Sequence, residues 1–371
     1  MSSRSDPVEE AAPEDRDLYD IATWEERTSL DGLSVAVYWL ITRLTKFLVL
    51  FTALLILLTI LASFGFGLVF DPVVAGLVAL SAIPAFGLAA YVYVSDVTTS
   101  EPLSLLVATF LLSVLTATFA AVLNSLTQPF FQPLGYLGLV LFFFLIVGPV
   151  EETVKLLAVR LYAYTDERFD AVIDGAVYGA IAGLGFVVIE NFVYIAGNID
   201  IDELRLGASA LGAGDGIAAI RALAGPGHVV YSAFAGYYLG LAKFNPEHRG
   251  PIIVKGLLIA ATIHALYNSL VGPATTAISS LTGLSMVPAL FVFVVVFQGF
   301  FGYILLLKIW RYRDAYLSTR PDPDGSGETA ATAATEPGVE PSADSSLDGF
   351  ESTDAESIDS ENERSERRGP D

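Results

Sequence analysis

The chain has 371 residues, of which 53% are hydrophobic and only 16% charged, and its formal net charge at pH 7 is −21. It contains no cysteine, which excludes disulfides, thiolate metal sites and a cysteine nucleophile. The excess of acidic residues argues against a general affinity for nucleic acid, because phosphates repel an acidic surface.

The negative charge is concentrated at the two ends of the chain. Residues 1–31 hold ten acidic and three basic residues, and residues 314–371 hold sixteen acidic and four basic residues. Because residues 321–371 are mainly small, polar and acidic, they bury too little apolar surface to become ordered. We expect disordered acidic termini, which would suit a halophilic organism. An acidic tail that binds a basic partner is the alternative interpretation.

Eight apolar stretches lie between these ends, each close to the ~20 residues that cross a bilayer as a helix. They are expected at about 47–70, 73–94, 103–123, 136–158, 172–196, 219–242, 252–272 and 287–308. Breakers such as Asp71-Pro72, Glu101-Pro102 and Gly272-Pro273 separate several of them. The predicted fold class is all-α, a polytopic membrane helical bundle of about eight transmembrane helices.

The basic residues near the helix ends predict the orientation, because cytoplasmic connections carry an excess of Lys and Arg. These residues gather before the first span, between the fourth and fifth, between the sixth and seventh, and after the eighth. They are Arg43, Lys46, Arg160, Arg168, Lys243, Arg249, Lys255, Lys308, Arg311 and Arg313. We therefore predict a multi-pass protein of the cell membrane, surrounded by the lipid bilayer, with both termini in the cytoplasm.

Ionisable side chains enter only spans four to seven. Asp174, Arg221 and Lys255 are close enough to the ends of their spans to be interfacial. The remaining set is Glu151, Glu152, Lys155, Glu190, His228 and His264. Charged groups in hydrocarbon are costly, so they normally face the bundle interior or a water cavity and indicate function.

These side chains are predicted to lie at one depth. Glu151 and Glu190 are equally far from the polar turn near residue 170, and the two histidines are equally far from Pro246. Because a helix rises ~1.5 Å per residue, equal distances from a turn mean equal heights. Four successive helices therefore present two acids and two histidines in one layer.

Two glycine patterns accompany this layer. Gly175, Gly179 and Gly183 form a small-xxx-small face in the fifth span, which permits close helix approach. Gly225-Pro226-Gly227 precedes His228 and predicts an interrupted helix in mid-segment. Such an interruption is tolerated at membrane depth only where it is buried in protein or lines a cavity.

Four motifs on successive spans carry a family resemblance. Glu151-Glu152-Thr-Val-Lys155 reads EExxK, Phe186-Val-Val-Ile-Glu190-Asn191 reads FxxxEN, His228 with Gly236 fits HxxxxxxxG, and His264 with Asn268 fits HxxxN. In this order they resemble the PrsW family of intramembrane proteases. That family is similar to the type II CAAX prenyl endopeptidases and the bacteriocin-processing membrane proteases. The resemblance covers about residues 134–272.

The resemblance implies hydrolysis of a peptide bond at membrane depth, in a membrane-anchored protein or peptide substrate. Carried over residue by residue, the catalytic set would be Glu151, Glu152, Glu190, His228 and His264, with Asn268 assisting. The expected organisation is an acidic cytoplasmic segment (1–40), scaffold helices 1–3 (41–133), a catalytic core of helices 4–7 (134–272), helix 8 (273–313) and a disordered acidic tail (314–371).

Amide hydrolysis needs a base for the water, a stabiliser for the oxyanion and a proton donor for the leaving amine. Desolvation in a low-dielectric pocket makes a glutamate a better base. We expect Glu151 to activate the water and Glu152 to bond Lys155 or backbone, although the two glutamates could be exchanged. His264 and Asn268 would then donate to the oxyanion.

A zinc site is the other interpretation of the same residues. Glu190, His228 and His264 could hold one Zn²⁺, because two imidazoles and a carboxylate make a normal open catalytic site. Metal-free and zinc catalysis use the same residue types, and we lean slightly towards metal. A proton- or ion-coupled transporter and a catalytically inactive scaffold are the alternative functions. The confinement of charges to four spans and the lack of a visible repeat argue against a transporter.

Overall fold

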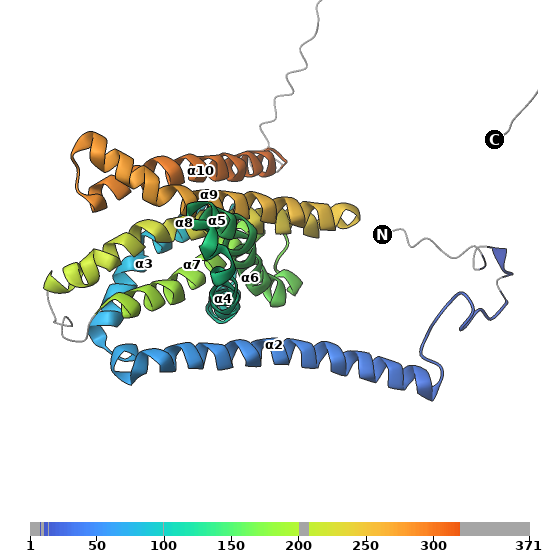
Figure 1. Cartoon of the computed structure of the whole chain (residues 1–371). Helices are drawn as coiled ribbons and strands as arrows, with labels where there is room; N and C mark the ends of the chain where they lie inside the picture. The colour runs from blue at the N-terminus through green and yellow to red at the C-terminus, as the bar shows by residue number, and fades with distance from the viewer. Residues whose placement is uncertain (1–7, 9–10, 14, 99, 200–207, 320–371) are drawn as a thin grey trace, which may run out of the picture. The chain divides into compact units, whose positions relative to one another are not determined.

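The computed structural model describes residues 8, 11–13, 15–98, 100–199 and 208–319. The long helices of this part are α2 (Ser29–Val69), α3 (Pro72–Val94), α4 (Leu103–Phe131), α5 (Gly135–Phe142), α6 (Gly148–Leu161), α7 (Val172–Asn198), α8 (Ala213–Lys243), α9 (Arg249–Thr282) and α10 (Met286–Ser318) (Figure 1). A π-helical turn, Phe143–Val147, joins α5 to α6. The described residues form no named strand, and the predicted all-α fold class is confirmed.

Six segments of the described chain are long and apolar enough to cross a membrane: Ser29–Val69, Pro72–Val94, Leu103–Leu161, Val172–Asn198, Pro246–Thr282 and Met286–Ser318. The 59-residue segment counts once, although the chain turns inside it at Gly135, whose φ is 56°. Divided there, it provides the third and fourth predicted spans. α8 is not among the six, so the sixth predicted span stays a prediction, supported by the packing of α8 inside the bundle.

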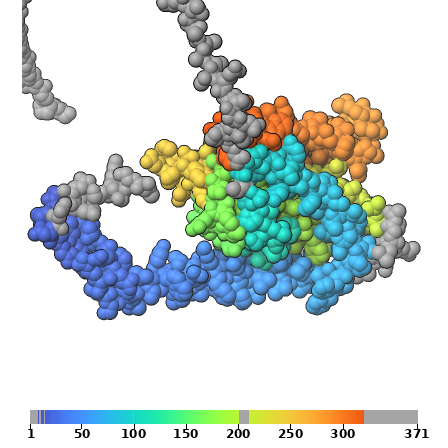
Figure 2. Space-filling model, turned by 180° about the vertical axis from the view of Figure 1, so that it is seen from behind, coloured from blue at the N-terminus to red at the C-terminus, as the bar shows by residue number. Residues whose placement is uncertain are grey.

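The first helix is longer than predicted. α2 begins at Ser29 and has 41 residues, because Thr28 caps it and Asp31 completes a capping box. Its residues from 33 to 48 are exposed, and Figure 2 shows this surface in blue. Apolar side chains that no described helix covers, such as Trp39 and Leu40, suit contact with lipid.

Two later helices also extend beyond their predicted ends. α9 continues through Pro273 to Thr282, so the prediction that Gly272-Pro273 ends a helix is wrong. Neighbouring helices in a membrane bundle make an internal proline tolerable. α10 continues to Ser318, into the predicted tail. Residues 1–7 and 320–371, which hold most of the ends predicted to be disordered, lie outside the described residues.

The close pairing of α7 with α8 confirms the prediction from the glycine ladder. A Cβ added at Gly179 would lie 2.3 Å from the carbonyl oxygen of Ser232, and one at Gly183 would lie 2.5 Å from that of His228. At Gly175 the corresponding distance, to a backbone carbonyl of α8, is 2.2 Å. Because no side chain separates the two backbones, residues of α7 and α8 at the same depth come into contact.

The helix interruption predicted at Gly225-Pro226-Gly227 is wrong. α8 passes through Pro226, and its non-helical dihedral angles lie near its start, at residues 214–216. Proline removes one backbone donor, so nearby carbonyls need other partners. Gln298 of α10 supplies one, because its Nε2 donates to the carbonyls of Leu223 and Ala224 at 3.3 and 3.5 Å.

Candidate active site

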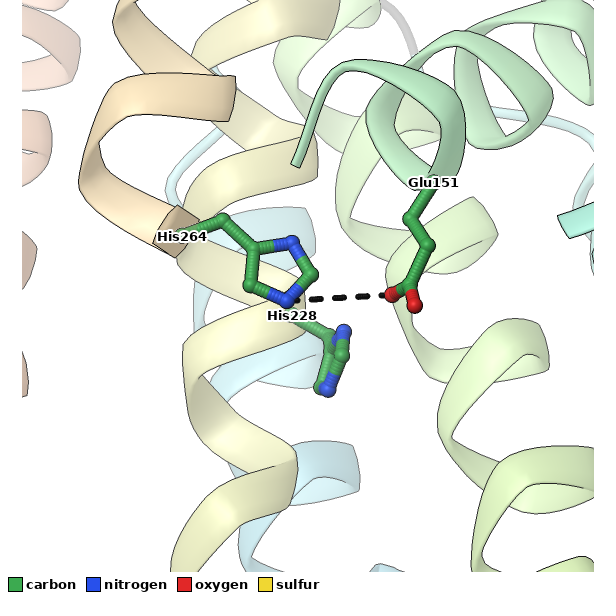
Figure 3. Close-up of side chains that lie close together, drawn as sticks. All are labelled: Glu151, His228 and His264. Atoms are coloured by element: carbon green, nitrogen blue, oxygen red, sulfur yellow. Dashed lines mark ion pairs between the residues drawn. The ribbon is translucent and has the colours of Figure 1, made fainter. Parts of the chain in front are cut away.

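The acidic and imidazole side chains meet inside the bundle, as predicted. Glu151 belongs to α6, Glu190 to α7, His228 to α8 and His264 to α9. The Nε2 atom of His264 lies 3.7 Å from Oε2 of Glu151, and the Nε2 atom of His228 lies 3.0 Å from Oε2 of Glu190. Figure 3 shows Glu151, His228 and His264 converging from three helices. The prediction that four helices present these groups in one layer is confirmed.

The start of α6 places Glu151 beside α9. A π-helical turn precedes it, a feature frequent at functional sites, and Pro149 lies at the helix N-terminus. A Cβ added at Gly148 would lie 2.6 Å from the carbonyl oxygen of Ala261. Glycine at this position therefore lets α6 approach α9 closely, and Glu151 follows in the first turn.

Glu151 has one oxygen held and one oxygen free. Oε1 accepts a hydrogen bond from Nδ2 of Asn124 at 3.1 Å. Oε2 is buried and has no hydrogen-bond partner among the described residues. The nearest cation, Nζ of Lys155, is 4.0 Å away from it. Glu151 therefore carries an acceptor atom that is available to a ligand.

Glu152 is fully buried and orients His264. Its Oε1 atom accepts from Nζ of Lys155 at 2.7 Å, the bond expected from sequence, and from Nδ1 of His264 at 2.9 Å. Its Oε2 atom accepts from the hydroxyl of Ser232 at 3.3 Å. Because an ionised carboxylate only accepts, the proton of His264 lies on Nδ1. Its Nε2 lone pair is left facing Glu151.

The ring of His228 is held at both nitrogens. Nζ of Lys155 lies 2.9 Å from Nδ1, and an ammonium only donates, so Nδ1 accepts. The ring proton is then on Nε2 and points at Glu190. Phe186 stacks on the imidazole with 5.3 Å between ring centroids and 24° between planes. Neighbours on α6 and α7 therefore fix the tautomer and the orientation of this side chain.

The expectation that Arg221 is interfacial is wrong. Its side chain is buried and forms an ion pair with Glu190, while its Nε donates to Oδ1 of Asn191 at 2.9 Å. The guanidinium also lies 4.3 Å from the ring centroid of Tyr194. α8 begins at Ala213, six residues before the predicted start, so Arg221 lies inside the helix rather than at its end.

A cavity of about 470 Å³ opens on this cluster; we call it the active-site cavity. Its polar lining includes Asn124, Glu151, Glu190, Arg221, His228, His264 and Asn268. Asn268 thus faces the same space as His264, as their spacing predicts. A second cavity of about 240 Å³, lined in part by Ile60 of α2, also reaches Glu151 and Glu190. Glu151 and Glu190 therefore belong to the lining of both cavities.

Three of these side chains form a donor set for a metal. Glu151, His228 and His264 each offer one ligand atom, and these atoms lie within 4.8 Å of one another. The set expected from sequence contained Glu190 in place of Glu151. Since Glu190 is engaged by Arg221 and His228, the geometry favours Glu151 in that position.

The chemistry of this donor set fits zinc. Imidazole nitrogen and carboxylate oxygen are ordinary zinc ligands. A metal-ligating histidine usually donates its other N–H to a carboxylate, as His264 donates to Glu152. For Nε2 of His228 to bind a metal, the ring proton would have to lie on Nδ1, and Lys155 could then not donate to that nitrogen.

Two residues of the site escaped sequence reasoning. Ser232, which donates to Glu152, stands four residues after His228 and so shares its helix face; this spacing could have found it. Asn124, which donates to Glu151, is separated from it by 27 positions. Its only signal is an amide side chain near the end of an otherwise apolar stretch.

Comparisons with known proteins point to a protease family. A family model described as PrsW family intramembrane metalloprotease matches residues 101–299. Protease PrsW of Halalkalibacterium halodurans is 30% identical over 190 residues, which are 50% of this chain and 79% of that protein. Protease PrsW of Clostridioides difficile is 30% identical over 170 residues, which are 45% of this chain and 67% of that protein. Protease PrsW of Bacillus subtilis is 27% identical over 187 residues, which are 50% of this chain and 78% of that protein. No solved structure matches the chain.

Proposed function

The chain belongs to the PrsW family of intramembrane metalloproteases and is an intramembrane endopeptidase, and we propose that Glu151 and His264 together activate the attacking water. The observation that carries this proposal is the 3.7 Å between Oε2 of Glu151 and Nε2 of His264. In the tautomer set by Glu152, both atoms are acceptors that face each other. A water bound there meets two bases, and either can take its proton.

The neighbouring residues divide the remaining tasks. Asn124 holds the other oxygen of Glu151 and keeps the carboxylate aimed at the water. Glu152 is a positioning residue, because it acts on the reaction only through the imidazole of His264. Once His264 has taken up a proton at Nε2, it can deliver that proton to the leaving amine.

The oxyanion needs donors that remain protonated in this arrangement. His264 accepts at Nε2 until it is protonated, so the donor role expected of it passes to other groups. The Nε2–H of His228 is already donated to Glu190, whereas Asn268 lines the active-site cavity. We assign to the amide of Asn268 the stabilisation of the tetrahedral oxyanion.

Glu151, His228 and His264 are the residues that would hold a zinc ion. When bound, zinc supplies a Lewis acid and lowers the pKa of its water. A bound zinc would take the acceptor atoms of Glu151 and His264 as ligands, so the roles of these two residues as free bases belong to the metal-free route. In either case Glu152 fixes the imidazole of His264. The two routes use the same residues and differ in whether a chelator stops the reaction.

The substrate is a protein in the membrane, and we propose that it enters as an extended segment. The two cavities meet at Glu151 and Glu190, so a peptide lying across both would present its backbone to the carboxylates. An extended chain is required because a peptide bond inside a helix is shielded by its neighbours. We further propose that both termini face the cytoplasm, as the distribution of basic residues indicates.

The test is proteolysis of a single-span reporter protein, co-reconstituted with the purified chain in liposomes and followed by gel. Glu151→Gln preserves the shape of the side chain and removes the base, so we expect a loss of about 10²–10⁴-fold in rate. The control is Glu167→Gln, since Glu167 is exposed on the turn before α7. Cleavage by Glu151→Gln at the wild-type rate would refute the assignment.

A further inference from the structure

A second group of carboxylates lies away from the active site, where the connection between α3 and α4 meets the start of α7. Asp96 follows α3, Glu101 precedes α4, and Asp174 lies in the first turn of α7. Each offers one oxygen, and the three atoms lie within 4.8 Å of one another. Asp174, expected to be interfacial from sequence, is 0% exposed, and Glu101 is 4% exposed.

Each carboxylate of this acidic triad has one oxygen held and one oxygen without a hydrogen-bond partner. One oxygen of Asp96 accepts hydrogen bonds from the backbone N–H and the hydroxyl of Thr98. One oxygen of Glu101 accepts from the hydroxyl of Tyr178. One oxygen of Asp174 accepts from the backbone N–H groups of residues 170 and 171. The other oxygens are Oδ2 of Asp96, Oε1 of Glu101 and Oδ1 of Asp174; they are buried and unpaired among the described residues. Glu101 and Asp174 are thus more than nine-tenths buried, and each has a carboxylate oxygen without a hydrogen-bond partner among the described residues.

No described lysine or arginine lies within 4.0 Å of these carboxylates. Burial raises the pKa of Glu101 to about 8, and the charges of Asp174 and Asp96 act in the same direction. Burial also raises the pKa of Asp96. Buried carboxylates require a compensating partner, since an isolated buried charge is very costly. The triad therefore calls for a proton or a cation.

We propose that Asp96, Glu101 and Asp174 bind one hard divalent cation, Ca²⁺ or Mg²⁺, which ties the α3–α4 connection to α7. These ions prefer oxygen ligands, and the triad offers only carboxylates, without the imidazole or thiolate that would favour zinc. Calcium–oxygen distances are ~2.3–2.6 Å, so oxygens on opposite sides of the ion are about 4.6–5.2 Å apart. One oxygen from each of the three carboxylates fits within that span.

This site is structural and independent of the peptidase assignment. Asp174 and Glu190 are sixteen residues apart on α7, or ~24 Å along the helix. Tyr178, one turn after Asp174, already donates to Glu101 and joins the same connection to α7. A bound cation would add a second link at this end of α7, the helix that carries Glu190 into the active site.

The experiment measures thermal unfolding of the purified full chain in detergent, first in EDTA and then with CaCl₂ or MgCl₂. We expect the midpoint temperature, Tm, of the wild type to rise by about 3–8 °C at saturating cation. Glu101→Gln keeps the shape and removes one charged ligand, so it should need at least about tenfold more cation. In EDTA it should be more stable than the wild type above about pH 8, where Glu101 is ionised. Mn²⁺, followed by its electron paramagnetic resonance signal, gives a direct binding measurement.

Two controls separate this site from the rest of the molecule. Glu167→Gln removes an exposed glutamate and should retain the full cation response. His264→Ala disables the proposed zinc site and should also retain it. The proposal is overturned by a wild type that shows no rise in Tm and no Mn²⁺ binding up to about 10 mM. It is equally overturned by an unchanged response in Glu101→Gln, or by a Tm that responds to pH alone.

Discussion

Nδ1 of His264 lies 2.9 Å from Oε1 of Glu152, the same oxygen that accepts from Lys155. Nε2 of the same ring faces Glu151, the preceding residue on α6. Consecutive residues of a helix point about 100° apart, so the two glutamates reach the imidazole from different sides. The paired glutamates of the first motif thus have separate tasks, one at the reacting water and one at the histidine.

Replacing Glu152 by glutamine should impair turnover more than binding. The amide can no longer hold the Nδ1–H tautomer as an ionised carboxylate does, so we expect a 10- to 100-fold fall in kcat with little change in KM. A fall in rate accompanied by a lower Tm and by a changed KM would indicate a structural role instead.

Zinc should bind in a ratio near one per chain and depend on two of the three histidines. The donor set predicts that His228→Ala and His264→Ala lose the metal in elemental analysis. His248→Ala is the matched control, because this third histidine is exposed on the turn between α8 and α9. A zinc chelator should abolish cleavage of the reporter. Full activity after verified metal removal would leave the metal-free route as the mechanism.

A single methyl group at Gly179 should weaken the pairing of α7 with α8. The added Cβ would lie 2.3 Å from a backbone carbonyl oxygen, so the helices must separate. We expect Gly179→Ala to lower Tm by about 5 °C or more and to reduce activity with it. Gly87→Ala in α3 is the control, because its Cβ would meet nothing within 4 Å. Equal behaviour of the two variants would contradict the role assigned to the ladder.

The acidic triad predicts a pH dependence in the absence of cations. The pKa of Glu101 is about 8 in the folded chain, against an ordinary value of 4.5, so folding favours its protonated form. This stabilisation is complete below pH 4.5 and is lost as the pH rises through 8. In EDTA, Tm should therefore fall by a few degrees between about pH 6 and 9. The titratable groups that act on the triad are Asp170, Tyr178, Lys243 and Tyr312.

Glu101→Gln distinguishes this effect from general alkaline destabilisation. The variant should show a flatter dependence of Tm on pH, because it has no proton to lose at that position. Asp166, whose pKa is lowered to about 2 by its hydrogen bonds with Arg168, titrates far below this window and does not contribute. If Tm of Glu101→Gln depended on pH as steeply as Tm of the wild type, the acidic triad would not be the cause of that dependence.

Much of the architecture follows from composition and periodicity. Apolar stretches of about twenty residues must be helical in lipid, since no water is present to satisfy the backbone. Equal distances from Pro246 and from the turn near residue 170 correctly placed two acids and two histidines in one layer. The failures were at helix ends and prolines: α2 begins at Ser29, and α8 and α9 continue through Pro226 and Pro273. Capping and contacts with neighbouring helices decide those points, and neither is visible in a hydropathy pattern.

The sequence by itself determined that this is a membrane protein, because long apolar stretches suffice for that, and its four motifs carried the resemblance to a protease family. Only the tertiary structure decided which polar side chains pair with one another. Arg221 neutralises Glu190, Glu152 takes one nitrogen of His264 and leaves the other for Glu151, and Asp96 meets Asp174 across distant segments. These contacts join different helices. The rotation of each helix about its own axis is set by its packing against its neighbours and not by any local spacing in the sequence.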